Sequence, residues 1–226
     1  MTRGGYFVTG TDTGVGKTWA ACALLEALAA IGKTVVGMKP VASGCDSIAG
    51  GLVCEDAEQL RRASTVDAPA KWRNPYRFLP PVSPHIAAAA AGRVIELRRI
   101  QAAYARLQKL ADQVVVEGVG GFRAPLGDSY DVSALAGVLQ LPVVLVVGLR
   151  LGCLNHALLT AEAIASRGLI LAGWIANCPE PPMAAIEENL CYLERRLGAP
   201  FLGMLPYQPE PSAAGLGKFI DISLIV

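Results

Sequence analysis

The stretch Tyr6-Phe7-Val8-Thr9-Gly10-Thr11-Asp12-Thr13-Gly14-Val15-Gly16-Lys17-Thr18 decides the fold of this chain. Its first four residues are β-branched or apolar and predict a strand, whereas the alanine-rich segment from Lys17 to Ile31 predicts a helix. A glycine-rich loop therefore joins a strand to a helix N-terminus. Backbone N–H groups of such a loop point to one place, where the helix dipole also favours negative charge. The order of elements predicts a phosphate-binding site.

Two side chains at the end of this loop strengthen the prediction. Lys17 adds a positive charge for the β- and γ-phosphates, and the Thr18 hydroxyl is placed to bind Mg²⁺. Five residues separate Gly10 from Gly16, one more than in the usual phosphate loop, so the loop is a lengthened variant. The alternative is a strand-to-helix turn with a solvated lysine. Because Gly-Lys-Thr is intact between strand and helix, we predict ATP or GTP binding; the loop does not indicate the reaction.

Composition limits the class of protein. The chain has 226 residues, of which 53% are hydrophobic and 17% charged, and this is enough for one well-packed core. A net charge of +1 provides no broad basic field, so we expect no nucleic acid partner. The apolar run from Leu141 to Leu149 is about half of the roughly 18 residues that a membrane helix needs, so we expect a buried strand and no membrane association.

The N-terminal residues lack the pattern of a secretion signal, which predicts a cytoplasmic protein. The six cysteines contain no Cys-x-x-Cys pair, so we expect reduced thiols that mostly fill the core. With two histidines only, a zinc site has little support.

Short β-branched runs alternate with longer helical patterns, which is typical of a parallel sheet buried on both faces. The expected strands are Tyr6–Thr9, Thr34–Lys39, Val114–Glu117, Val143–Val147, Ala172–Asn177 and Phe201–Leu205. The expected helices are Lys17–Ile31, Pro84–Ala91, Ile95–Ala111, Val132–Leu139, Asn155–Ser166 and Met183–Leu197. We interpret the proline-rich segment Asn74–Pro84 as a loop. These patterns predict a single α/β domain over residues 1–226, a three-layer sandwich with a mostly parallel central sheet and helices on both faces.

Ligands of such sheets collect at the carboxyl ends of the strands. Glu117 ends an apolar strand and is followed by glycines, so we favour a Mg²⁺-linked role over a helix cap. Lys39 ends another strand, where a buried lysine is costly unless it reaches an anion; the alternative is a side chain that extends to water. Ser43 and Gly44 follow closely and could bind the same ligand.

Three further polar residues have two interpretations each. Asp56 is a second candidate for the metal site and equally a helix N-cap. Asn177 could pair with a purine edge or form a turn. Asn155 has the position of a helix N-cap, whose exposed amides could also hold a substrate carboxylate.

Six motifs together resemble the dethiobiotin synthetase family over almost the whole chain. They are Gly10-Thr-Asp-Thr-Gly-Val-Gly-Lys-Thr18, Lys39-Pro-Val-Ala-Ser-Gly44, Ser83-Pro-His-Ile86, Val116-Glu-Gly-Val-Gly-Gly121, Leu151-Gly-Cys-Leu-Asn-His156 and Ala172-Gly-Trp-Ile-Ala-Asn177. Their order and the length of the phosphate loop are similar to those of the family, whose fold is that of phosphate-loop NTPases.

The resemblance implies an ATP-dependent ligase of biotin biosynthesis. In that family 7,8-diaminononanoate captures CO₂ as a carbamate, and the carbamate attacks the γ-phosphate to give a carbamic–phosphoric anhydride. The second amine then closes a cyclic urea and releases phosphate. The alternative is a partner-regulated ATPase switch of the same fold. Many such switches carry an extra lysine early in the loop, where this chain has Thr11-Asp12-Thr13.

Matching the motifs position by position implies a set of site residues. Those around the carbamate and γ-phosphate would be Thr13, Lys17, Lys39 and Ser43, and those organising Mg²⁺ would be Thr18, Asp56 and Glu117. The other nucleotide-binding residues would be Gly14, Val15, Gly16, Gly118, Val119, Gly120, Asn177, Pro206, Tyr207 and Gln208. The diamine would contact Ser43, Gly120 and Asn155, the last across a homodimer interface. Gly14 stands where some family members carry an acidic residue.

Overall fold

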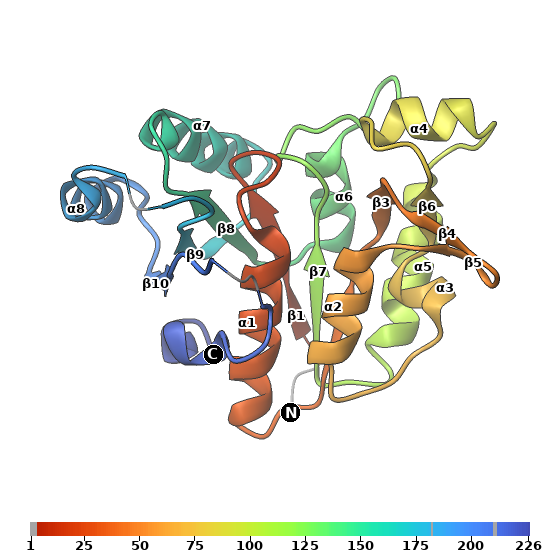
Figure 1. Ribbon diagram of the computed structural model, residues 1–226, viewed down its shortest axis with the longest axis horizontal. Helices are drawn as coiled ribbons and strands as arrows, with labels where there is room; N and C mark the ends of the chain where they lie inside the picture. Colours follow the sequence, from red (N-terminus) through yellow and green to blue (C-terminus); the bar gives the residue numbers. More distant parts are fainter. Residues whose placement is uncertain (1–3, 182, 210–211) are drawn as a thin grey trace.

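A computed structural model describes residues 4–181, 183–209 and 212–226 of the chain. Its central sheet has six strands, all paired in parallel (Figure 1). In spatial order they are β10 (Phe201–Leu205), β9 (Leu171–Asn177), β8 (Val143–Gly148), β1 (Gly4–Gly10), β7 (Gln113–Glu117) and β2 (Val35–Met38). All six correspond to the strands that the sequence predicted. The carboxyl ends of β1, β7 and β2 therefore lie side by side.

Helices cover both faces of this sheet, which confirms the predicted three-layer sandwich (Figure 1). One face carries α1 (Lys17–Ala30), α2 (Glu55–Ala63) and the short turns η1 (Gly217–Phe219) and η2 (Ile222–Leu224). The other carries α5 (Leu97–Leu107), α6 (Val132–Leu139), α7 (Cys153–Ser166) and α8 (Ile186–Arg196). Within the described residues, no helix is both long and apolar enough to cross a bilayer.

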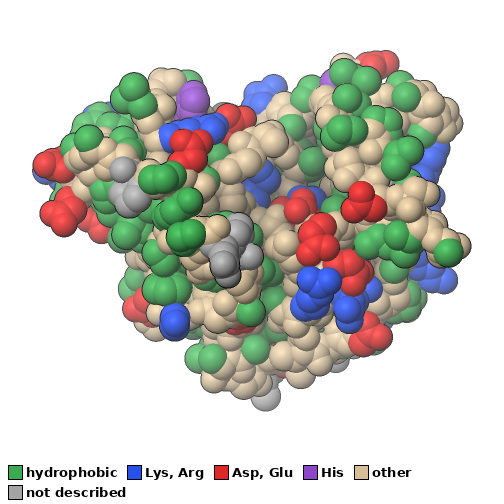
Figure 2. Space-filling model, in the orientation of Figure 1, with side chains coloured by type: hydrophobic (Ala, Val, Ile, Leu, Met, Phe, Trp, Pro, Cys, Tyr) green, Lys and Arg blue, Asp and Glu red, His purple; other side chains and the backbone are tan. Residues whose placement is uncertain are grey.

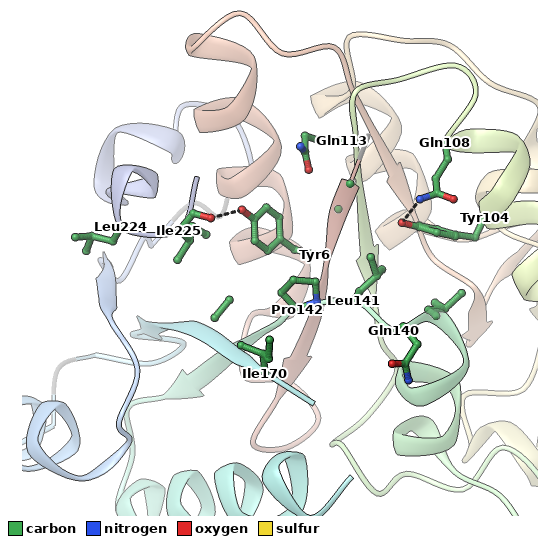
Figure 3. Close-up of a pocket in the computed structure, with 14 residues that line it drawn as sticks. Tyr6, Tyr104, Gln108, Gln113, Gln140, Leu141, Pro142, Ile170, Leu224 and Ile225 are labelled. Atoms are coloured by element: carbon green, nitrogen blue, oxygen red, sulfur yellow. Dashed lines mark hydrogen bonds between the residues drawn. The ribbon is translucent and has the colours of Figure 1, made fainter. Parts of the chain in front are cut away.

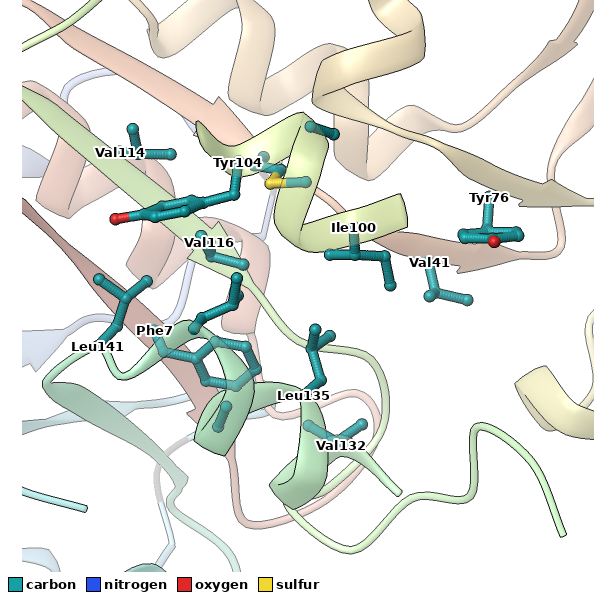
Figure 4. Packing of buried hydrophobic residues seen from close by; sticks show 14 of the residues in the cluster. Phe7, Val41, Tyr76, Ile100, Tyr104, Val114, Val116, Val132, Leu135 and Leu141 are labelled. Carbon is teal, nitrogen blue, oxygen red and sulfur yellow. The ribbon is translucent and has the colours of Figure 1, made fainter. Parts of the chain in front are cut away.

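The alternation of side chains along β1 shows how the two apolar layers form. Tyr6 and Val8 pack with Leu24 of α1, whereas Phe7 points the other way, toward α5 and α6. Figure 4 shows Phe7 close to Val116 and Leu135 in this second layer. Because successive strand residues face opposite sides, one buried strand supplies both cores.

Short elements surround the end of the sheet where β2 lies. They are β3 (Val41–Ser43), the hairpin of β4 (Asp46–Ile48) and β5 (Gly51–Val53), α3 (Ala70–Arg73), β6 (Tyr76–Phe78) and α4 (Pro84–Ala90). The expectation of a loop over Asn74–Pro84 was wrong at β6, which pairs in parallel with β3 and buries Tyr76 and Phe78. A strand of three residues is too short for its alternation to be recognised in the sequence.

The helix boundaries correct two N-cap predictions. Helix α7 begins at Cys153 after Gly152, which has a φ of 95°, so Asn155 lies inside the first turn and is not the N-cap. Helix α2 begins at Glu55 after Cys54, so Asp56 is not an N-cap either. In both helices the N-cap residue lies earlier in the chain than the polar residue that the sequence suggested for this position.

Candidate nucleotide and phosphoryl-transfer site

The phosphate loop spans the space between the end of β1 and the start of α1. Gly14 and Gly16 have φ values of 73° and 88°, a region that favours glycine. A Cβ on Gly16 would lie 2.1 Å from Asn177 Nδ2, so no other residue fits there. Lys17 Nζ donates to the carbonyl oxygen of Asp12 at 2.8 Å, which brings the ammonium back over the loop. The loop therefore has a backbone conformation that depends on its glycines, with the Lys17 ammonium beside it.

Two neighbouring strand ends support this loop. Asn177, at the end of β9, donates from Nδ2 to the carbonyl oxygen of Val15 at 3.0 Å. Arg150, which follows β8, pairs with Asp12 at 2.6 Å, and the other carboxylate oxygen of Asp12 accepts the N–H of Thr13 at 2.7 Å. These contacts hold both ends of the loop against the sheet.

Lys39 directly follows β2, and its ammonium is buried against acidic groups. Nζ lies 2.5 Å from Glu117 Oε1 and 2.8 Å from Asp56 Oδ2, and it donates to the carbonyl oxygen of Gly118 at 3.2 Å. Three acceptors thus satisfy its three N–H groups. Since Lys39 is only 3% exposed, the alternative of a side chain that extends to water is wrong.

Thr18, Asp56 and Glu117 meet at the same point. Thr18 Oγ1 donates to Glu117 Oε1 at 2.9 Å, and Glu117 Oε2 is buried without a hydrogen-bond partner among the described residues. Two carboxylates and a hydroxyl are oxygen ligands that suit Mg²⁺, which completes its shell with phosphates and water. Within the described part of the chain, no group of three His, Cys, Asp or Glu side chains is arranged to hold a metal.

The surroundings shift the pKa values of the two lysines in opposite directions. Burial, followed by the nearby charge of Lys39, lowers the pKa of Lys17 to about 8. Burial also tends to lower the pKa of Lys39, but the carboxylates of Glu117 and Asp56 outweigh it and raise this pKa above its usual range. Burial alone would raise the pKa of Asp56, and Lys39 holds it below the usual value. Lys39 therefore stays charged, whereas Lys17 titrates at mildly alkaline pH.

These groups line a cavity of about 400 Å³. In the view of Figure 2 the surface is hollowed between its left and right halves, with basic and acidic side chains near the hollow. The predicted residues in the cavity wall are Thr13, Gly14, Gly16, Lys17, Thr18, Lys39, Ser43, Asp56, Glu117, Val119, Gly120 and Asn177. A second hollow of about 590 Å³ shares Thr13, Ser43, Val119 and Gly120 with it. Because these four residues line both cavities, the two cavities are adjacent.

Several predicted residues lie outside the cavity wall. Val15 is buried beneath the loop, and Gly118 contributes its carbonyl oxygen to Lys39. Pro206, Tyr207 and Gln208 follow β10, whose last residue Leu205 is in register with Asn177. Asn155 is exposed on α7 and does not line the cavity of its own chain.

Sequence reasoning missed three residues of the wall, namely Trp19, Gln59 and Pro179. Trp19 directly follows Thr18, and Gln59 lies three residues after Asp56 on α2, so helical spacing from a recognised residue could have found it.

Known proteins resemble this chain over almost its whole length. A protein-family model described as an AAA domain matches residues 4–214. The ATP-dependent dethiobiotin synthetase of Nitrosospira multiformis is 53% identical over 98% of this chain and 96% of its own length. The enzyme of the same name from Aromatoleum aromaticum is 57% identical over 93% of this chain and 96% of its own. The chain belongs to the ATP-dependent dethiobiotin synthetase family.

Solved structures show that this chain shares its fold with more distant proteins. A MinC:MinD cell division complex from Aquifex aeolicus superposes with a TM-score of 0.57 at 14% identity, over 91% of this chain and 82% of the other. A ParA family ATPase from Chlorobium tepidum gives 0.56 at 14% identity, over 92% and 85%. At this identity the likeness concerns the fold alone.

The chain has another large cavity, of about 600 Å³, at the amino ends of the strands (Figure 3). Tyr6, Gln108, Gln113 and Pro142 are among its lining residues, and none of the described lining residues is charged. This cavity therefore offers no positive charge to balance a triphosphate, unlike the cavity lined by Lys17 and Lys39.

Proposed function

We propose that this protein closes the cyclic urea ring of dethiobiotin from 7,8-diaminononanoate, CO₂ and ATP, releasing ADP and phosphate. The observation that carries the proposal is the buried, charged Lys39 in the wall of a phosphate-loop cavity. Phosphoryl transfer requires little covalent chemistry from the protein and depends on positive charge held where negative charge develops. Lys17 and Lys39 supply that charge from two sides.

Lys39 acts on the oxygen atoms that react. Its ammonium neutralises the carbamate and the terminal phosphate, which otherwise repel each other, and so brings the attacking oxygen to the phosphorus. Thr13 and Ser43 lie on the surface shared by the two hollows and would donate hydroxyl hydrogen bonds to the same anions. The diamine then occupies the second hollow, beside Gly120.

Mg²⁺ would be held by Thr18, Asp56 and Glu117, and when bound it neutralises phosphate oxygens. Lys39 is paired with the same two carboxylates. The proposed role of Lys39 therefore requires its ammonium to turn from these carboxylates toward the γ-phosphate when nucleotide binds.

The adenine would lie beside Asn177. Its Oδ1 is buried without a hydrogen-bond partner among the described residues, so it is placed to accept from the purine amino group. Backbone of Gly14, Val15 and Gly16 would follow the phosphates, and that of Gly118, Val119 and Gly120 the γ-phosphate side. Pro206, Tyr207 and Gln208 would extend the adenine wall beyond β10.

We further propose a homodimer in which the substrate carboxylate is bound by the partner subunit. Asn155 in the first turn of α7 is exposed and lies outside the cavity of its own chain, and the nearby Leu151 is 95% exposed. A helix N-terminus suits a carboxylate, and an apolar side chain beside it suits an alkyl chain or another subunit. The whole chain would act as one cytoplasmic domain.

The experiment is an omission assay. The purified protein is incubated with 7,8-diaminononanoate, bicarbonate, Mg²⁺ and ATP, and each component is left out in turn. The proposal expects dethiobiotin by mass spectrometry in the complete mixture only. ATP hydrolysis that proceeds equally without the diamine and yields no dethiobiotin would instead indicate a partner-regulated ATPase.

A further inference from the structure

Two cysteines face each other at the base of the β4–β5 hairpin. The hairpin register pairs Asp46 with Val53, Ser47 with Leu52 and Ile48 with Gly51. One step outward, the same register places Cys45 opposite Cys54. Neither sequence spacing nor a Cys-x-x-Cys motif marked this pair, because the turn brings it together.

The backbone around the two cysteines indicates the type of pair. The N–H of Cys45 donates to the carbonyl oxygen of Phe78 at 3.0 Å, and the carbonyl oxygen of Cys54 accepts the N–H of Glu58 at 3.1 Å. Neither of these two backbone groups bonds to the other cysteine, so the cysteines form a non-hydrogen-bonded pair of the hairpin. Non-hydrogen-bonded antiparallel pairs have Cα atoms about 4.5 Å apart, which lies in the range of about 4.4–6.8 Å that disulfides span.

The side chains also meet. Cys45 and Cys54 are 3% and 6% exposed and form a small buried cluster with Ala42 and Ala57. The Cys45 thiol donates to the carbonyl oxygen of Ala42 at 3.8 Å, within the same cluster. The thiolate is the form of a cysteine that reacts with oxidants.

We propose that Cys45 and Cys54 form an oxidisable pair that closes into a reversible disulfide in the folded protein. With hydrogen peroxide as oxidant, the deprotonated Cys45 sulfur attacks one peroxide oxygen, which breaks the O–O bond, gives a sulfenic acid and releases hydroxide. The Cys54 sulfur then displaces the sulfenic oxygen as water and forms the S–S bond. The two cysteines are oxidised by two electrons, and peroxide is reduced to water.

The position of the β4–β5 hairpin exposes this cysteine pair to oxidant and connects it to the proposed active site. The strands β4 and β5 are largely exposed and project from the body of the protein (Figure 1), so local opening of the hairpin uncovers the thiols. Ser43 lies two residues before Cys45, and Asp56 lies two residues after Cys54; both line the nucleotide cavity. A disulfide would therefore tie together two segments of the cavity wall.

The chain allows a direct test. Trypsin cleaves after Lys33 and Arg61, and the fragment 34–61 contains Cys45, Cys54 and no other cysteine. Folded protein with Cys191→Ser, which removes the exposed thiol, is treated with hydrogen peroxide, alkylated and digested. We expect fragment 34–61 to lose two hydrogen atoms and take up no alkyl group, and dithiothreitol to restore two alkylation sites.

Matched variants separate the pair from the other thiols. Cys45→Ser and Cys54→Ser should each abolish the cross-linked fragment, and the latter keeps a good cap for α2. Cys22→Ser, at a buried position outside the pair, should leave the cross-link unchanged. Closure of this short loop should also raise the Tm of the oxidised protein by a few degrees. Oxidation that leaves fragment 34–61 with two free thiols, or a cross-link that forms only in denaturant, would overturn the proposal.

Discussion

The ammonium of Lys39 forms ion pairs with two carboxylates, at 2.5 Å from Glu117 and 2.8 Å from Asp56. If one of these three side chains were removed, the charges of the other two would no longer be balanced. Lys39, Glu117 and Asp56 therefore depend on one another to stay ionised. The proposed reaction uses the same charge, because Lys39 lies at the end of β2, next to the end of β7.

The first prediction concerns Lys39 itself. Lys39→Gln should lower turnover by about 100-fold to 1,000-fold, because it removes charge from the reacting oxygens. ATP affinity should remain largely intact, since Lys17 and the loop amides are untouched. Steady-state kinetics and calorimetry measure the two effects. Near-normal turnover would contradict the role assigned to Lys39.

Lys17 should behave differently. Lys17→Gln removes a charge that lies over the phosphate loop, so we expect nucleotide binding and turnover to weaken together, each by about 10-fold or more. Calorimetric titration with ATP provides the measurement. An unchanged affinity for nucleotide would show that Lys17 does not contact the phosphates.

The lowered pKa of Lys17, about 8, predicts proton uptake. Below pH 8 the free protein already carries this charge, whereas at pH 9 it is largely neutral. Bound phosphates favour the charged form, so MgATP binding at pH 9 should take up a proton at Lys17 and at pH 7 should not. Calorimetry in two buffers of different ionisation enthalpy measures the difference.

Lys17→Arg is the matched control, because a guanidinium stays charged at both pH values. The variant should lose the extra uptake at pH 9. Equal uptake in Lys17→Arg and in the original protein would assign the proton to another group.

Asn155 tests the shared site. Asn155→Ala should raise the KM for 7,8-diaminononanoate and leave that for ATP nearly unchanged, because the residue lies outside the nucleotide cavity of its own chain. Mixing this variant with Lys39→Gln should restore part of the activity if a mixed dimer contains one intact site. An effect confined to ATP would place Asn155 elsewhere.

Gly16 tests the support of the loop. A Cβ there would meet Asn177 Nδ2 at 2.1 Å, and the φ of 88° is unfavourable for alanine. Gly16→Ala should therefore weaken ATP binding by at least about 10-fold, measured by calorimetry. Gly14→Ala is an informative comparison, since its Cβ would meet nothing within 4 Å. Equal losses in both variants would show that backbone strain, rather than the clash with Asn177, is responsible.

The sequence predicted the six strands of the sheet because each is a short apolar run, and those of β7 and β8 are rich in valine and almost fully buried. It predicted the phosphate loop because its chemistry lies in one continuous stretch. The cluster of Lys39, Asp56 and Glu117 was harder to predict, because these residues are distant in the sequence. They meet only through the order of the strands and the placement of α2. Helix α2 was missed because it is short and mostly polar, with Ala57 and Leu60 as its buried residues.

The central claim is that Lys39 bridges the γ-phosphate and the substrate carbamate. A crystal structure with a non-hydrolysable ATP analogue, Mg²⁺ and 7,8-diaminononanoate tests it most directly, through the distance from Lys39 Nζ to the terminal phosphate oxygens. The account predicts hydrogen-bond distance to a γ-phosphate oxygen, with Asp56 and Glu117 turned to the metal. Lys39 still bonded to both carboxylates, or turned to solvent, with the nucleotide in place would contradict it.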